Sequence, residues 1–151
     1  MTSAPLILVL NAGSSSLKIA AFADQELILR AGVERTNQPP DKRRLWIVNR
    51  VGQPISHGAA STIDSSSLIE VVIASLATLR PGQRITAMGH RVVHGGDRFT
   101  SPVRITPEVL VELESLTPLA PLHQPHNVAE IRTASRILPE VPHVACFDTA
   151  F

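Results

Sequence analysis

The chain of 151 residues is 44% hydrophobic and 18% charged, which suffices for one globular domain with a buried core and excludes a disordered tail. Its 14 basic and 13 acidic residues leave a net charge of +1, too little for the broad positive field that attracts nucleic acid or anionic lipid. We therefore expect no nucleic acid and no membrane among its partners.

A single cysteine, Cys146, can form neither an internal disulfide nor a cysteine metal cluster, which favours a reducing compartment and predicts a cytoplasmic protein. The start of the chain lacks the pattern of a signal peptide, because MTSAP has no Lys or Arg and the apolar run that follows is short. No other segment is long enough to span a bilayer.

The first third of the chain has the pattern of an antiparallel meander. Leu6–Leu10 is a continuous aliphatic run, typical of a central strand buried on both faces, and Leu17–Phe22 continues as its partner. Gln25–Val33 follows as a third strand, and Arg44–Val51 alternates apolar with polar residues. The polar stretches between and after them are predicted to be surface loops.

One of these loops carries Lys42, Arg43 and Arg44 in a row. Such a cluster is either an anion-binding patch or solvated loop charge, and the second interpretation is the commoner one.

The period then changes to that of a helix. Six residues from Ser67 onward fall on one stripe that ends at Pro81-Gly82: Leu68, Val71, Val72, Ser75, Leu76 and Leu79. The remaining predicted elements are a strand at Ile85–Met88, a helix at Pro107–Leu116, a helix through Val128 and Leu138, and a strand at Val144–Phe147. A meander followed by alternating helices and strands predicts a mixed α/β layered fold.

The turn Asn11-Ala-Gly-Ser-Ser-Ser lies between the first two strands. Its backbone N–H groups could converge into a nest for phosphate, with Gly13 permitting positive φ and Ser14 and Ser16 adding donors. The alternative to a phosphate nest is an ordinary polar hairpin turn that binds no ligand. A Walker loop is excluded, because no second Gly precedes Lys18 and no helical stripe follows it.

Two neighbours of this turn favour a ligand site. Asn11 ends a buried strand, where its amide oxygen could face a hydrated Mg²⁺, a hard ion that prefers oxygen. Lys18 points away from Leu17 and Ile19, so its cation either serves a ligand or reaches for water.

The stretch VLNAGSSSLK resembles the first signature of acetate kinase, of the acetokinase family in the actin and sugar-kinase superfamily. The resemblance implies that the hairpin holds ATP phosphates, that Asn11 serves Mg²⁺ or Mn²⁺, and that Lys18 serves ATP or ADP. It also implies a ribonuclease H-like (actin-like ATPase) domain with a mixed five-stranded sheet, an antiparallel meander and flanking helices.

A second segment, MGHRVVHGGDRFTSP, contains His90, Arg91, Val93 and His94. In extended chain the two histidines are about 13 Å apart, too far for one metal ion. Arg91 and Val93 would share a side, so that a guanidinium and a small aliphatic group could hold a short carboxylic acid. The alternative for Arg91 is a structural salt bridge. Because GHRVVHGG also resembles acetate kinase, we favour substrate binding.

The loop LAPLHQPHN and the last strand add three candidates. His123, with the two histidines above, could form a metal site or take a neutral polar role. The resemblance implies that Leu122 lines the apolar acyl pocket, that His123 lies beside the transferring phosphoryl group, and that Asp148 of FDTAF is catalytic. A carboxylic acid with a pKa of about 4 to 5 is already ionised at pH 7, so Asp148 would orient Mg²⁺ or water rather than remove a proton. Without the resemblance, Asp148 would be a turn or cap residue.

The resemblance covers nearly the whole chain and implies that residues 1–151 are the first of two domains of an acetate kinase, a homodimer in its full-length form. The second domain would lie outside this chain, and so would a C-terminal helix that packs back on the first domain. The chain alone should therefore be inactive, and part of its core should be uncovered. The alternatives are a propionate kinase and, in a different class, a non-catalytic actin-like nucleotide-binding domain.

Overall fold

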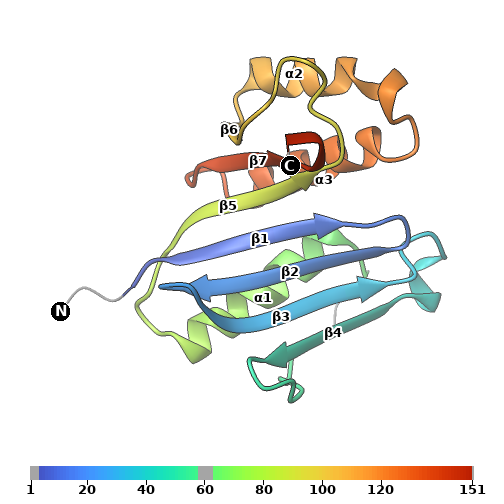
Figure 1. Cartoon of the computed structure of the whole chain (residues 1–151). Coiled ribbons are helices and arrows are strands. Elements are labelled where there is room, and N and C mark those ends of the chain that lie inside the picture. The colour runs from blue at the N-terminus through green and yellow to red at the C-terminus, as the bar shows by residue number, and fades with distance from the viewer. Residues whose placement is uncertain (1–3, 58–62, 151) are drawn as a thin grey trace.

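A computed structural model describes residues 4–57 and 63–150. These residues form one mixed sheet of seven strands in the order β4-β3-β2-β1-β5-β7-β6 (Figure 1). The strands are β1 (Leu6–Ala12), β2 (Ser16–Ala23), β3 (Glu26–Glu34), β4 (Arg44–Asn49), β5 (Ile85–Val92), β6 (Val103–Arg104) and β7 (His143–Phe147). The helices are α1 (Ser65–Leu79), α2 (Pro107–Ser115) and α3 (Gln124–Ile137), with short 3-10 turns η1 (Pro40–Lys42), η2 (Thr117–Leu119) and η3 (Asp148–Ala150).

The predicted α/β class and the antiparallel meander are confirmed, whereas the predicted count of five strands is wrong. The count of five was implied by the family resemblance, whereas the sequence pattern predicted six strands, β4 among them, and did not predict β6. β4 pairs with β3 at one edge, and the two-residue strand β6 pairs antiparallel with β7 at the other. A strand as short as β6 has no periodicity of its own, so the sequence pattern could not indicate it.

Strand β1 is the centre of the sheet. It pairs antiparallel with β2 and parallel with β5, and β5 pairs parallel with β7. The parallel ladder continues beyond the predicted end of the strand at Met88, so that β5 reaches Val92 and includes Arg91. Helix α3 also begins earlier than expected, at Gln124, directly after His123.

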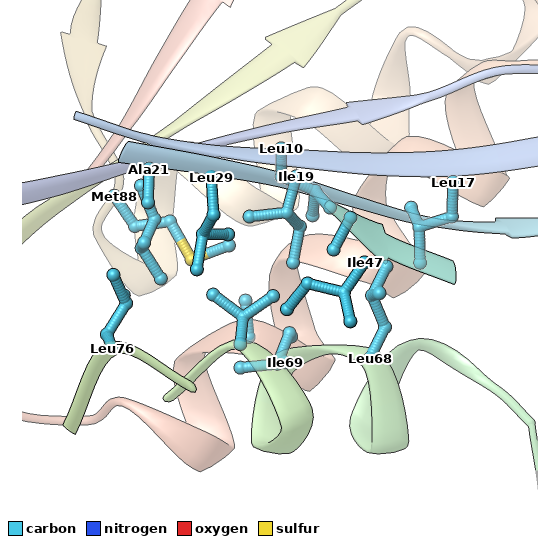
Figure 2. Close-up of a cluster of buried hydrophobic side chains, with 14 of the residues drawn as sticks. Leu10, Leu17, Ile19, Ala21, Leu29, Ile47, Leu68, Ile69, Leu76 and Met88 are labelled. Carbon is cyan, nitrogen blue, oxygen red and sulfur yellow. The ribbon is translucent and has the colours of Figure 1, made fainter. Parts of the chain in front are cut away.

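The main core lies between the sheet and α1. Figure 2 shows Leu68, Ile69 and Leu76 of α1 facing strand side chains that include Leu10 and Ile19. All of these are at most 2% exposed. Four of the six residues predicted for the stripe are buried, namely Leu68, Val72, Ser75 and Leu76, whereas Leu79 is 43% exposed.

Helix α1 begins with a reciprocal cap. The Ser67 N–H donates to the Asp64 side chain, and the Asp64 N–H donates to Oγ of Ser67, both at 2.9 Å. Such a capping box satisfies two N–H groups that the first turn cannot pair. It places the helix start at Ser65, two residues before the predicted one.

The opposite face of the sheet is open among the described residues. Ile7 and Val9 are 42% and 39% exposed, whereas Leu6, Leu8 and Leu10 are at most 2% exposed. The prediction that β1 is buried on both faces is therefore wrong for this chain. In Figure 1, α1 and α3 lie behind the sheet, and no described helix covers the front of β1 to β4.

A second, smaller core joins β5, β7, α2 and α3. It contains Val92, Phe99, Leu113, Val128, Ile131, Ala145 and Phe147. The rings of Phe99 and Phe147 stack with centroids 5.2 Å apart, an arrangement that favours a fixed orientation of the turn before Phe99. None of the helices in the described ranges is long and apolar enough to cross a membrane.

Gly95 lies where this second core approaches the backbone most closely. A Cβ there would be 2.5 Å from the carbonyl oxygen of Phe99 and 3.0 Å from Cγ of Phe147. We expect Gly95→Ala to lower the free energy of unfolding by about 1–3 kcal/mol, measured by urea denaturation. Gly89→Ala is the control, because its nearest neighbour, the Leu8 carbonyl oxygen, is 4.0 Å away. Equal losses in the two variants would contradict this account.

Candidate functional site

Three polar side chains meet where the parallel strands end. Asn11 lies near the end of β1, Arg91 near the end of β5, and Asp148 directly after β7. In Figure 1 the arrowheads of these three strands point to the same side of the sheet. Ligand sites of open α/β sheets gather at this carboxyl edge.

Arg91 holds the cluster together through charge-assisted hydrogen bonds. Its Nε donates to Oδ1 of Asp148 at 2.9 Å, and its Nη2 donates to Oδ2 at 2.7 Å. Its Nη1 donates to Oδ1 of Asn11 at 3.0 Å. The hydrogen bonds and charge of Asp148 raise the pKa of the Arg91 guanidinium, which therefore stays charged at any physiological pH.

The guanidinium keeps donor capacity for a ligand. Of its five N–H hydrogens, the bonds to Asp148 and Asn11 use one each on Nε, Nη1 and Nη2. One hydrogen on each Nη nitrogen has no acceptor among the described residues. The side chain is also half exposed, so an incoming carboxylate can reach it. The salt-bridge interpretation of Arg91 is confirmed, with Asp148 as the partner, and its role in substrate binding stays a prediction.

Lys18 lies on the same face as this cluster. It is the cross-strand partner of Asn11, and it is exposed, whereas Leu17 and Ile19 are at most 2% exposed. The predicted direction of Lys18 is therefore confirmed. Beside it is a hollow of about 260 Å³, lined by Val9, Asn11, Lys18, Ile19, Ala20, Arg30, Ala31 and Trp46.

The hairpin turn differs from the prediction at Gly13. Among the described glycines only Gly52, Gly82 and Gly96 have positive φ, so Gly13 does not supply that conformation. Its N–H donates to the carbonyl oxygen of Ser16 at 2.8 Å, which closes the turn and removes one donor from the expected nest. A Cβ on Gly13 would lie 3.0 Å from Oγ of Ser16, so Gly13 provides room for that side chain. Ser14 is exposed and Ser16 half buried.

Leu122 and His123 lie just before α3, and both are exposed, Leu122 to 85%. His123 is the N-cap of α3 but makes no side-chain cap. Neither side chain bonds to Asn11, Arg91 or Asp148 in the part of the chain that the structure describes. Their roles in an acyl pocket and beside the phosphoryl group stay predictions.

Val93 follows β5 in a bend rather than continuing the strand. It is half buried, and its N–H donates to Oδ1 of Asn127 at 3.0 Å. The expected alternation that would put Val93 on the side of Arg91 is not established by a contact, so its place beside a substrate stays a prediction.

Three polar residues that sequence reasoning missed hold the segments around the site. Asn127 binds Val93, and Nε2 of the fully buried Gln124 donates to the carbonyl oxygens of His94 and Leu113 at 3.1 and 3.0 Å. The Gly95 N–H donates to Oγ1 of Thr149 at 3.1 Å. The signals available were weak, because polar residues in a first helical turn are common.

The candidate histidines His90 and His94 lie in different surroundings. His94 Nδ1 accepts the Gly96 N–H at 2.9 Å, and within residues 4–57 and 63–150 there is no group of three or more His, Cys, Asp or Glu side chains that could hold a metal. His90 instead pairs with His143 in the interior, with ring nitrogens 2.9 Å apart. His90 therefore takes the neutral polar role.

The partners of His143 fix the hydrogens of this pair. Nε2 of His143 lies 2.8 Å from the carbonyl oxygen of Leu138, which can only accept, so this nitrogen carries the hydrogen. Nδ1 of His143 then accepts the N–H of His90 Nε2. Nδ1 of His90 is buried without a described partner. Burial first, and the neighbouring His143 second, lower the pKa of His90 from 6.5 to about 3.

Residues 6–151 match the family model described as the acetokinase family. The chain belongs to this family. Acetate kinase of Deinococcus radiodurans is 44% identical over 146 residues, which cover 95% of this chain and 36% of the relative. Acetate kinase of Rhodopseudomonas palustris CGA009 is 39% identical over 97% of this chain and 38% of its own length.

Solved structures agree with this membership in the acetokinase family. A propionate kinase from Francisella tularensis superposes with a TM-score of 0.82 and 32% identity, over 97% of this chain and 37% of that one. Porphyromonas gingivalis acetate kinase superposes with a TM-score of 0.81 and 33% identity, over 98% and 38% respectively. The expected actin-like α/β fold is thereby confirmed. The chain spans little more than a third of the length of the curated relatives it matches.

The buried histidine pair predicts how stability depends on pH. Unfolded His90 takes up a proton below about pH 6.5, whereas folded His90 stays neutral down to about pH 3, so its contribution is lost as pH falls through this window. We expect the free energy of unfolding to fall less between about pH 7 and pH 5 in His90→Gln than in the parent chain. Chemical denaturation at several pH values measures this slope.

The control for this experiment is His123→Gln, which removes an exposed imidazole and should leave the slope as it is. An unchanged slope in His90→Gln would show that other groups cause the acid destabilisation.

Proposed function

We propose that this chain supplies the carboxylate-binding part of an acetate kinase. The reaction transfers the γ-phosphoryl group of ATP reversibly to a carboxylate oxygen of acetate and gives acetyl phosphate and ADP. The observation that supports this most is the convergence of Asn11, Arg91 and Asp148 at one edge of the sheet, at 2.7 to 3.0 Å. Membership in the acetokinase family supports the same chemistry.

Arg91 would bind and orient the acetate. The two N–H hydrogens left on its Nη nitrogens can pair with the substrate carboxylate, and Asp148 holds the guanidinium in place from its other edge. Val93 and Leu122 would contact the methyl group. A fixed cation also keeps the attacking oxygen near its target, and positioning of this kind supplies much of the rate of phosphoryl transfer.

The donor set fits a hard divalent cation. Asn11 offers an amide oxygen and Asp148 a carboxylate, and Mg²⁺ in kinases is held by one or two such groups together with substrate phosphates. These two residues would hold Mg²⁺ or Mn²⁺, directly or through water. When bound, the ion would neutralise charge on the phosphate oxygens.

The remaining candidates would act on the phosphates. Lys18 lies on the face of Asn11, where its charge can attract the ATP phosphates. Ser14 and Ser16 would donate hydrogen bonds from the hairpin. His123 would donate to the oxygens of the transferring phosphoryl group as negative charge develops on them. No base is needed for acetate, because it is already ionised.

Replacing Arg91 in the full-length protein tests whether its guanidinium binds the carboxylate of acetate. We expect Arg91→Leu to raise KM for acetate by about tenfold or more, because a charge-assisted hydrogen bond contributes about 1.5–3 kcal/mol, and to change KM for ATP far less. Steady-state kinetics with each substrate varied in turn measure both constants. Arg104→Leu, at an exposed arginine of β6, is the matched control. Unchanged acetate saturation would remove Arg91 from the substrate site.

The isolated chain should not catalyse the reaction. Phosphoryl transfer needs groups on both sides of the reactants, and this chain spans little more than a third of its relatives. We expect no acetyl phosphate above background when the chain alone is incubated with ATP, Mg²⁺ and acetate and the product is trapped as hydroxamate. Turnover by the isolated chain would overturn the proposal that a second part completes the site.

Propionate is the second candidate substrate, because one of the similar structures is a propionate kinase. One methylene changes kcat/KM by about 1–3 kcal/mol, so the ratio of this constant for acetate and propionate in the full-length protein decides between them.

A further inference from the structure

A polar hollow lies between the turn of the β1–β2 hairpin and the loop that follows β3. It has a volume of about 450 Å³ and is lined by Ser15, Arg35, Asn37, Gln38 and Lys42. Every one of these side chains is polar or basic, and no carboxylate is among them. The hollow beside Lys18, by contrast, has mostly apolar walls. Hydrogen-bond donors and two cations without an acidic neighbour in the lining are the chemistry that an anion requires.

Backbone bonds hold the walls of this hollow in place. The Thr36 N–H donates to the carbonyl oxygen of Ser15 at 3.1 Å, which fastens the loop after β3 to the hairpin turn. The Gln38 N–H donates to the carbonyl oxygen of Arg35 at 2.9 Å, and the Lys42 N–H donates to that of Pro39 at 2.9 Å. Hydrogen bonds within the chain therefore define the shape of this loop.

The three basic residues of this loop have different roles. Arg43 is structural, because its Nε donates to the carbonyl oxygen of Gln38 and its Nη1 to that of Ile63, both at 2.8 Å. Arg35 and Lys42 have no ion pair within the described ranges. The nearby Asp41 lies on η1 and does not line the hollow. Two cations therefore face one solvent-filled space.

Arg35 also has an uncommon backbone conformation, with φ of 61°. Residues other than glycine rarely adopt this left-handed region, and such exceptions gather at functional positions. The fold does not need a long side chain here, since glycine would adopt the same backbone with less strain. The arginine side chain itself is therefore the feature that needs an explanation.

We propose that this hollow is a binding site for a diphosphate anion. Its volume exceeds the needs of a single phosphate, and Arg35 and Lys42 can each take one phosphoryl group while Ser15, Asn37 and Gln38 donate hydrogen bonds. The site is separate from the surface of Lys18 and Asn11, and it goes beyond the proposed kinase activity. Because Ser15 belongs to the hairpin, an anion here would tie the hairpin turn to the loop after β3.

Calorimetric titration of the full chain with sodium pyrophosphate, without divalent metal, tests the site. We expect Arg35→Gln and Lys42→Gln each to weaken pyrophosphate binding by about tenfold or more, since each removes a charge-assisted contact. Arg44→Gln is the matched control, because it removes one arginine charge nearby but outside the hollow. Its affinity should stay within about twofold. Arg35→Gly, which relieves the backbone strain, should lose affinity as Arg35→Gln does while keeping the fold.

Three outcomes of the pyrophosphate titration would overturn the site. If the parent chain did not bind pyrophosphate, the site would not exist. If Arg44→Gln and Arg35→Gln lost affinity equally, the binding would come from the general positive charge of the loop and not from this hollow. Loss of binding in Lys18→Gln alone would place the anion on the other side of the hairpin and leave the kinase proposal intact. A parallel titration with ADP separates two sources of the same chemistry, since weaker ADP binding in Arg35→Gln assigns the site to a nucleotide diphosphate and unchanged ADP binding to free pyrophosphate.

Discussion

Parallel pairing of β1, β5 and β7 is the constraint on which the candidate site depends. Parallel strands end at the same edge of a sheet, so three residues that are 57 and 80 positions apart in the chain become neighbours. The helices that connect parallel strands cover one face of the sheet and supply the core that keeps the strands in register. The geometry of the Arg91 cluster is thus a consequence of the core behind it.

The two faces of β5 place adjacent residues in different electrostatic environments. Arg91 points to the open face, where solvent and the Asp148 carboxylate stabilise its charge. His90 points to the core, where burial keeps its ring neutral and His143 pairs with it. The alternation of side chains in a strand thus puts a permanent cation and an uncharged imidazole one residue apart.

The open face of the sheet is consistent with a chain that spans about a third of its relatives. Exposed Ile7 and Val9 lie on the same face as Arg91 and Lys18, next to buried neighbours that alternate with them. Arg91, whose side chain is half exposed, is accessible to solvent on this face. Helices therefore cover one face of the sheet, and the face on which the chemistry is proposed is not covered by a described helix.

The sequence by itself determined the class of fold and the identity of most candidate residues. Strong local patterns predicted the meander, most of the buried stripe of α1 and the direction of Lys18, because periodicity and side-chain alternation are local properties. The VLNAGSSSLK and GHRVVHGG motifs indicated the family, and residues 6–151 match its model.

Only the tertiary structure decided which of these residues touch. The Arg91–Asp148–Asn11 bonds, the His90–His143 pair and the bond from Gly95 to Thr149 all join distant segments, and strand edges as short as β6 exist only because a neighbour pairs with them. The backbone at Gly13 and Arg35 also contradicted or escaped local expectation, since the pairing of the hairpin with its neighbours sets those angles. Local sequence patterns thus determine the strands and helices, and long-range strand pairing determines which side chains come into contact.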